Sequence, residues 1–279
     1  MVQQTQTKNQ NSNALAQSGN NVPALNDETL AKDAGAGFDE VKGRDDLAIP
    51  FIVPLSHANP ETIKGKGEYI EGAKAGMILN KVTKDLYNGE TGLTVVPLYF
   101  QKQFVEWEDR GTGSRAPLMI HPSESTILTK CTRDSDGKLR TEDNTYIEDT
   151  RNHYVLLLKE DGTAEPAIIA MKGSQLKKSR RWNTIAMGQK VKDSKGQMFT
   201  APLFAFIYTL TTTNESNDKG NWTGWDITLK GKNEDPAIYG QARALYASIK
   251  KGDIQARPVQ DEEKSAKSEK KNKSEEIPF

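Results

Sequence analysis

The sequence predicts a mainly β protein, a closed or nearly closed β-barrel with helical insertions, between two segments without stable structure. The β-type runs outnumber the helical patterns by about eight to two, and they do not alternate with helices as parallel strands do. The apolar content of 35% is low for a wholly folded chain of 279 residues, whereas the charged content of 27% is ordinary. A folded centre with polar ends accounts for both values.

Composition divides the chain into three parts. Residues 1–45 are rich in Gln, Asn, Ala and Gly, so apart from one short helix around 26–38 they bury too little to offset the entropy of ordering. Residues 46–255 carry the β-type runs and form the expected folded domain. Residues 256–279 are charged and nearly free of large apolar side chains, which predicts a disordered tail.

Proline, asparagine and glycine punctuate the first strands. Pro50 and Pro54 favour an edge strand, because proline cannot donate to a β-ladder. Asn88 and Gly89 predict a hairpin turn, because both tolerate positive φ. Pro97 marks a bulge in the longest β-type stretch. Strands are expected at 46–56, 76–83, 93–108, 125–133, 152–160 and 165–173.

The next segment predicts a helix followed by a hairpin. Ser174 is a suitable N-cap, and the absence of Gly or Pro before Gly188 favours a helix of about 13 residues. The runs 201–216 and 221–231 then form two strands around a short polar loop.

The last helix, over 235–252, has clear signals at both ends. Asp235 is the expected N-cap, Pro236 occupies the first helical position, and Gly252 follows the last turn. Apolar residues recur along it at helical spacing, so we expect one face to pack against the sheet.

The motifs argue against an enzyme, a cofactor and a metal site. The sequence has no glycine-rich phosphate loop, no nucleophile elbow and no histidine pair at metal spacing. A single cysteine, Cys131, excludes an intramolecular disulfide and a multi-thiolate zinc site. The acids of 142–149 fit a solvated loop better than a two-metal cluster. No run approaches membrane-spanning length, and the N-terminus lacks a signal-peptide core, so we expect a cytoplasmic protein without a membrane partner.

Positive charge is concentrated although the whole chain is neutral. Lys plus Arg and Asp plus Glu both total 38, yet residues 172–195 hold eight basic residues and one acid, Asp193. Such segregation predicts a local polyanion site, with a solvated helix face as the alternative. The basic residues are Lys172, Lys177, Lys178, Arg180, Arg181, Lys190, Lys192 and Lys195.

Aromatic rings near these cations supply the second part of a single-strand site, because any base can stack on a ring. Phe104, Trp182 and Trp222 are expected to be exposed beside basic residues, with either a stacking or a structural role. Trp107 and Trp225, and the trio Phe204, Phe206 and Tyr208, are assigned to the core. The expected DNA-contacting residues are Lys102, Phe104, Lys172, Lys177, Lys178, Arg180, Arg181, Trp182 and Trp222.

The tail ends on an apolar motif that its composition does not predict. Its last residues are Glu275, Glu276, Ile277, Pro278 and Phe279. Proline fixes its own φ and restricts the residue before it, so the end is already extended. A partner with an apolar pocket rimmed by Arg or Lys could bind the terminal ring and carboxylate together.

This motif resembles the C-terminal tip of bacterial single-stranded DNA-binding proteins, which end in several acids followed by Ile-Pro-Phe. In that family an OB-fold barrel binds DNA, and a flexible linker carries the tip that recruits replication, recombination and repair enzymes. The folded region is here about twice the length of a bacterial OB domain. The segments "DLAIPFIVPL" and "LTVVPLYFQKQFVEW" are similar to those of single-stranded DNA-binding proteins of tailed bacteriophages.

The resemblance implies an enlarged OB-fold-like barrel that binds and protects single-stranded DNA during phage replication or recombination. It also implies that residues 275–279 recruit replication and recombination proteins of the host or the phage, in the bacterial cytoplasm. A homo-oligomer is compatible with this role. The alternatives are a single-strand annealing recombinase and an interaction adaptor without DNA affinity.

Overall fold

The computed structural model describes residues 31–32, 36–37, 49–108, 116–135, 137–218, 220–254 and 256. The chain divides into two units, Met1–Asp46 and Leu47–Phe279. In the first unit Ala31 and Lys32 are helical, within the helix expected around 26–38. The expected tail lies outside the described residues except for Ala256, and so does the whole motif 275–279. The elements below belong to the second unit.

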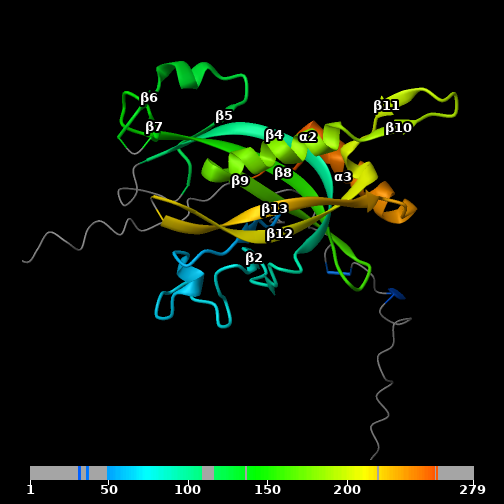
Figure 1. Ribbon diagram of the computed structural model, residues 1–279, viewed down its shortest axis with the longest axis horizontal. Helices are drawn as coiled ribbons and strands as arrows, with labels where there is room; N and C mark the ends of the chain where they lie inside the picture. The colour runs from blue at the N-terminus through cyan, green and yellow to red at the C-terminus, as the bar shows by residue number, and fades with distance from the viewer. Residues whose placement is uncertain are drawn as a thin grey trace, which may run out of the picture. The chain divides into compact units, whose positions relative to one another are not determined.

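A curled antiparallel sheet is the framework of this unit (Figure 1). Its long strands lie in the order β9-β8-β4-β12-β13, and helix α2 (Leu176–Met187) follows β9 in the chain. Numbered along the chain, the strand order is 3-2-1-4-5, with the helix between the third and fourth strands. This is the arrangement of an OB-fold, so the predicted mainly β, OB-fold-like fold is confirmed, and its large sheet curls into a half-barrel. The strands are β4 (Leu93–Trp107), β8 (Tyr146–Leu158), β9 (Ala164–Lys172), β12 (Phe206–Asn217) and β13 (Gly220–Lys232).

A small sheet spans the two edges of the half-barrel. Strands β1 (Ile52–Pro54), β2 (Ile78–Asn80) and β3 (Leu86–Tyr87) form it. On one side Ile168 of β9 donates its backbone N–H to the carbonyl of Pro50 at 2.9 Å. On the other side Thr223 of β13 donates its N–H to Ser56 Oγ at 2.8 Å. The segment that contains β1 therefore bridges β9 and β13, the two edge strands of the half-barrel.

Further elements enlarge the barrel. Strand β5 pairs with the far end of β4, β7 pairs with β8, and β6 pairs with β7. Strands β10 and β11 form a separate hairpin directly after α2, and helix α3 follows β13. Four short 3-10 helices complete the described elements of this unit. The bounds are β5 Met119–Pro122, β6 Thr132–Arg133, β7 Leu139–Arg140, β10 Lys190–Lys192, β11 Met198–Thr200, α3 Pro236–Lys251, and the 3-10 turns Pro60–Thr62, Thr126–Lys130, Gly173–Gln175 and Leu203–Ala205.

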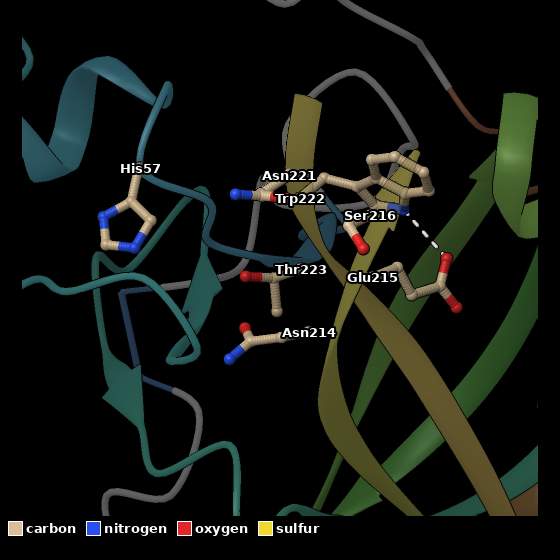
Figure 2. Close-up of a pocket in the computed structure, with 7 residues that line it drawn as sticks. All are labelled: His57, Asn214, Glu215, Ser216, Asn221, Trp222 and Thr223. Atoms are coloured by element: carbon tan, nitrogen blue, oxygen red, sulfur yellow. Dashed lines mark hydrogen bonds between the residues drawn. The ribbon is translucent and has the colours of Figure 1, made fainter. Parts of the chain in front are cut away.

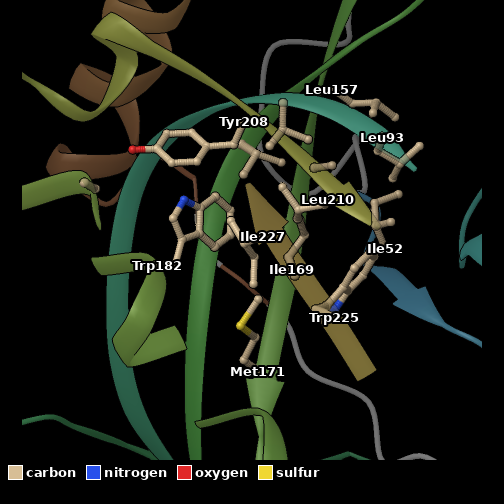
Figure 3. Close-up of a cluster of buried hydrophobic side chains, with 14 of the residues drawn as sticks. Ile52, Leu93, Leu157, Ile169, Met171, Trp182, Tyr208, Leu210, Trp225 and Ile227 are labelled. Carbon is tan, nitrogen blue, oxygen red and sulfur yellow. The ribbon is translucent and has the colours of Figure 1, made fainter. Parts of the chain in front are cut away.

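Both faces of the curled sheet are buried, because successive side chains of a strand point to opposite faces. Val95 and Leu157 belong to the inner cluster, which also receives Trp182 from α2 and Ile52 from β1 (Figure 3). Their neighbours along the strands form an outer cluster, which α3 covers with one apolar face. The outer cluster contains Val96, Leu98, Tyr154, Leu156, Ile168, Phe204, Ala242, Ile249 and Ala256.

A buried histidine joins α2 to the sheet. His153 of β8 is 3% exposed and its Nε2 lies 2.8 Å from Ser179 Oγ of α2. Its ring stacks on Trp182 with a centroid distance of 4.4 Å and an interplanar angle of 13°. Burial, reinforced by the charge of Arg151, lowers the pKa of His153 to about 3. The imidazole is therefore neutral at pH 7, as its apolar surroundings require.

Elements with complete local signals form as the sequence predicts. The register between β4 and β8 shifts between Pro97 and Tyr99, which confirms the bulge. Asp235 accepts N–H bonds from the first turn of α3, and Gly252 ends that helix with a left-handed φ of 78°. The hairpin of β12 and β13 matches the predicted pair of strands.

Three local expectations are wrong. Most of 125–133 forms a 3-10 turn rather than a strand, because the Ser125 hydroxyl caps it by accepting from Ile127 N–H. Ser174 lies in the 3-10 turn before α2, whose N-cap is Gln175.

The third correction concerns the turn at Asn88 and Gly89. The turn forms, but the strands on either side of it, β3 and β4, do not pair with each other. Instead Gly89 accepts a backbone N–H bond from Thr212 of β12 at 2.8 Å. A Cβ at Gly89 would lie 1.8 Å from the carbonyl oxygen of Gly76, so glycine is needed for close approach rather than for a hairpin.

Acidification should destabilise this core. An unfolded histidine has a pKa of about 6.5, so between that value and the folded pKa the unfolded chain binds more protons and stability falls as pH falls. The free energy of unfolding should therefore lose about 1.2 kcal/mol from His153 between pH 6 and pH 5. Urea unfolding of the native chain and of His153→Gln at both pH values measures the difference. An equal pH dependence of the two proteins would contradict this assignment.

Candidate nucleic-acid interface

Helix α2 carries the predicted basic segment and is fixed by its inward residues. Trp182 is 1% exposed and Ala186 is 7% exposed, and both pack into the inner cluster. Lys177, Arg180 and Arg181 are exposed on the other side of the helix. Because residues three and four apart share a helix face, one side of α2 is apolar and the other is basic.

Glu215 of β12 connects α2 to the β12–β13 hairpin. Lys178 Nζ lies 3.1 Å from Glu215 Oε1, and Trp222 Nε1 donates to Oε2 at 2.8 Å. Gln175 Nε2 donates to the same oxygen at 3.3 Å. Burial alone would raise the pKa of Glu215, but the hydrogen bonds from Lys178 and Trp222 outweigh it and the pKa is lowered. Glu215 is therefore an ionised acceptor that fixes the Trp222 ring.

A glycine permits this arrangement. Gln175 Oε1 accepts the backbone N–H of Trp225 at 2.9 Å, so its side chain lies directly against β13. A Cβ at Gly224 would lie 2.6 Å from Gln175 Nε2 and 2.9 Å from Glu215 Cδ. Any larger residue would displace the side chains that hold α2 to the hairpin.

The opposite face of the hairpin is hollowed. A cavity of about 320 Å³ lies there, close to the lower limit of small-ligand pockets. Asn214 pairs across the ladder with Thr223, and Ser216 pairs with Asn221, whereas Glu215 pairs with Trp222 between them. Figure 2 shows the Trp222 ring directed toward Glu215 and away from His57. The cavity is polar, and its lining residues are His57, Asn214, Glu215, Ser216, Asn221, Trp222 and Thr223.

Two of the three predicted stacking rings are buried, which corrects the expectation that they are exposed. Phe104 is 2% exposed because β5 and β8 flank it, at His121 and Asp149. Lys102 Nζ lies 4.7 Å from the Phe104 ring centroid, so this pair forms a cation–π contact. Trp182 is a core residue. Trp222 remains partly exposed, and Trp107 and Trp225 are buried as predicted.

Several predicted cations have acidic partners from distant elements. Lys172 lies 3.3 Å from Glu148, and Arg181 Nη1 lies 2.8 Å from Asp226 Oδ1. Lys178 pairs with Glu215, as described above. Among the described residues no carboxylate pairs with Lys177, Arg180, Lys190, Lys192 or Lys195. The basic surface is therefore narrower than the sequence predicted, and it extends from α2 into the β10–β11 hairpin.

Sequence reasoning missed the aromatic residue of that hairpin. Phe199 is 47% exposed and Met198 is 57% exposed, both on β11. The signal was the alternation of Lys190, Val191 and Lys192 before a Gly-containing turn, which is typical of a short strand. The cavity residues Asn214 and Asn221 carried no signal, because only strand pairing brings them together.

The acids of 142–149 do not form a common site. Glu142 and Asp143 are exposed in a turn, whereas Glu148 and Asp149 lie on β8 and pair with Lys172 and Arg151. Across the described ranges, no group of three or more His, Cys, Asp or Glu is placed to hold a metal ion. Within the same ranges no helix has the length and apolarity needed to cross a membrane.

Removal of the Glu215 carboxylate should lower the free energy of unfolding more than removal of an exposed carboxylate does. Glu215→Ala leaves Lys178 and the Trp222 N–H without their acceptor, at a cost of roughly 1–3 kcal/mol. The matched control, Asp226→Ala, breaks a pair whose side chains are 54% and 41% exposed, and should cost less than about 1 kcal/mol. Chemical denaturation measures both losses. Equal losses would show that the Glu215 contacts do not stabilise the fold.

Comparison with known proteins supports a phage protein. Residues 16–255 match the model of a family described as Pam3 phage gp34-like protein. No curated protein and no solved structure matches the chain. The matched residues include every strand of the half-barrel, both α2 and α3, and the β10–β11 hairpin. The protein therefore belongs to the Pam3 phage gp34-like family.

Proposed function

We propose that this protein binds single-stranded DNA without catalysing a reaction, and protects it during phage replication or recombination. The observation that carries the proposal is the row of cations without carboxylate partners in the described chain, beginning at Lys177 and Arg180 on α2. A chain with 38 basic and 38 acidic residues attracts a polyanion only where it separates charge locally.

The fold supports the same proposal. OB-fold barrels bind oligonucleotides beside their loops, and the hairpin loop between β12 and β13 is the loop between the fourth and fifth barrel strands. Trp222 lies at that hairpin with a ring held by Glu215. Its partly exposed face is suited to stacking of one base, while phosphates lie against Lys177 and Arg180.

Loss of the α2 cations should weaken binding in a salt-dependent way. For single strands each neutralised phosphate contributes about 0.7 to the slope of log K against log salt. Lys177→Gln with Arg180→Gln should therefore reduce that slope by roughly 1.4 for oligo-dT, measured by tryptophan quenching. The matched control is Arg243→Gln with Lys251→Gln, two exposed cations of α3 on the opposite side of the sheet.

Three outcomes would contradict the proposal or replace it with one of the alternatives. Oligo-dT binding that does not respond to salt would exclude an electrostatic interface. Absence of binding by the native chain would favour the adaptor. Rapid pairing of complementary strands, with ring-sized particles in light scattering, would favour the annealing recombinase.

The C-terminal motif should serve partner binding rather than DNA binding. We base this on its similarity to the tip of bacterial single-stranded DNA-binding proteins, since residues 275–279 lie outside the described structure. Deletion of Ile277–Phe279 should leave oligo-dT affinity unchanged or raised, and should abolish capture of bacterial replication proteins from a host extract. Loss of DNA affinity in the deletion variant would refute this division of roles.

A further inference from the structure

We infer that the β10–β11 hairpin is a second contact for the bound strand, in which Phe199 stacks on a base and neighbouring lysines bind phosphates. The inference rests on the proposed function and deepens it, because it extends the DNA path beyond α2. We call residues 190–200 the arm (Figure 1).

The arm is a hairpin with a defined register and a hydrogen-bonded turn. Lys190 pairs with Thr200, Val191 with Phe199, and Lys192 with Met198. Asp193 Oδ1 accepts the backbone N–H groups of Lys195 at 2.8 Å and Gln197 at 2.9 Å, which closes the turn. Gly196 adopts the left-handed φ of 78° that the turn needs. These contacts give the arm a defined shape before any ligand binds.

The arm contributes almost nothing to the core. Its root is fixed by the N–H of Ala201, which donates to the carbonyl of Gln189 at 3.0 Å, and by Val191, which packs against the inner cluster. All residues from 192 to 200 are exposed. A two-stranded hairpin that buries so little is marginal by itself, and exposed Met198 and Phe199 add an apolar surface. An intramolecular packing role does not account for these side chains.

The charge of the arm specifies the class of ligand. Lys190, Lys192 and Lys195 have no carboxylate partner in the described part of the chain. The one acid, Asp193, is directed to the backbone of the turn. This local positive charge suits an anionic ligand.

The exposed ring selects among anionic ligands. Phe199 pairs with Val191 and shares its face of the arm, whereas Lys190 and Lys192 belong to the other face of the same narrow ribbon. An exposed ring on a hairpin that also carries exposed cations is the composition of a single-strand site, in which bases stack and phosphates are neutralised. The arm also directly follows α2 in the chain, so its cations continue the series begun by Lys177 and Arg180.

Replacement of the ring tests base stacking. Phe199→Ala should weaken oligo-dT binding by about 5- to 150-fold without changing its salt slope, whereas Phe199→Trp should retain affinity. The matched control is Tyr69→Ala, which removes an exposed ring, 36% exposed, from the loop after β1. Circular dichroism and melting curves should show that each variant is folded, which the exposure of both rings predicts.

Replacement of the lysines tests the phosphate contacts. Lys192→Gln with Lys195→Gln should lower the salt slope by roughly 1.4, and Lys64→Gln with Lys66→Gln, two exposed lysines elsewhere, should not. Arm variants that bind as tightly as the native chain, while the α2 variant is weakened, would overturn the arm contact and leave the proposed function standing. A change of oligomeric mass in place of affinity would assign the arm to a subunit contact and overturn the inference. Absence of binding by the native chain would overturn both.

Discussion

The pairing of β4 with β8 is the constraint on which the rest of the barrel depends. Every other strand of the large sheet attaches to one of these two, either directly or through one neighbour. Their ladder runs from Thr94–Leu158 to Trp107–Tyr146, with one interruption at Pro97. The bulge there increases the local twist of the pair. The part of the pair toward Leu93 curls into the half-barrel, and the part toward Trp107 carries β5 and β7.

This geometry also decides how α2 presents its charge. The stack of Trp182 on His153 fixes the inner side of the helix against β8. Glu215 and Asp226 then receive the cations that lie toward the hairpin, at Lys178 and Arg181. Lys177 and Arg180 remain toward solvent. The two acids therefore neutralise only the side of α2 that faces the hairpin, and the other side of the helix keeps its positive charge.

The elements that were predicted correctly from the sequence are those whose ends are set by interactions between residues close together in the chain. Asp235, Pro236 and Gly252 define α3 because each acts within one turn of its own position. Pro97 and the β12–β13 hairpin were predictable for the same reason. The 3-10 turn at 126–130 was missed because its β-type composition was outweighed by one hydroxyl cap.

The candidate site was less predictable, because its burial and pairing come from distant segments. Phe104 is buried by β5 and β8, and Trp182 by strands on both sides of it in the chain. Lys172, Lys178 and Arg181 are neutralised by acids that are 24 to 45 residues away, so a count within one window of sequence overstates the free charge. Phe199 was missed because a short strand of an isolated hairpin gives a weak periodic signal.

The position of β1 has a consequence for how the chain folds. Ser56 bonds to Thr223 across 167 residues of sequence, and Thr212 bonds to Gly76 across 136. The segment that is synthesised first thus cannot complete its contacts until the final hairpin has been made. Closing so large a loop is entropically costly, and chains dominated by such contacts fold slowly. During synthesis the early segment lacks part of its contacts until β13 has been made, and that interval is when this barrel is most open to pairing with another chain.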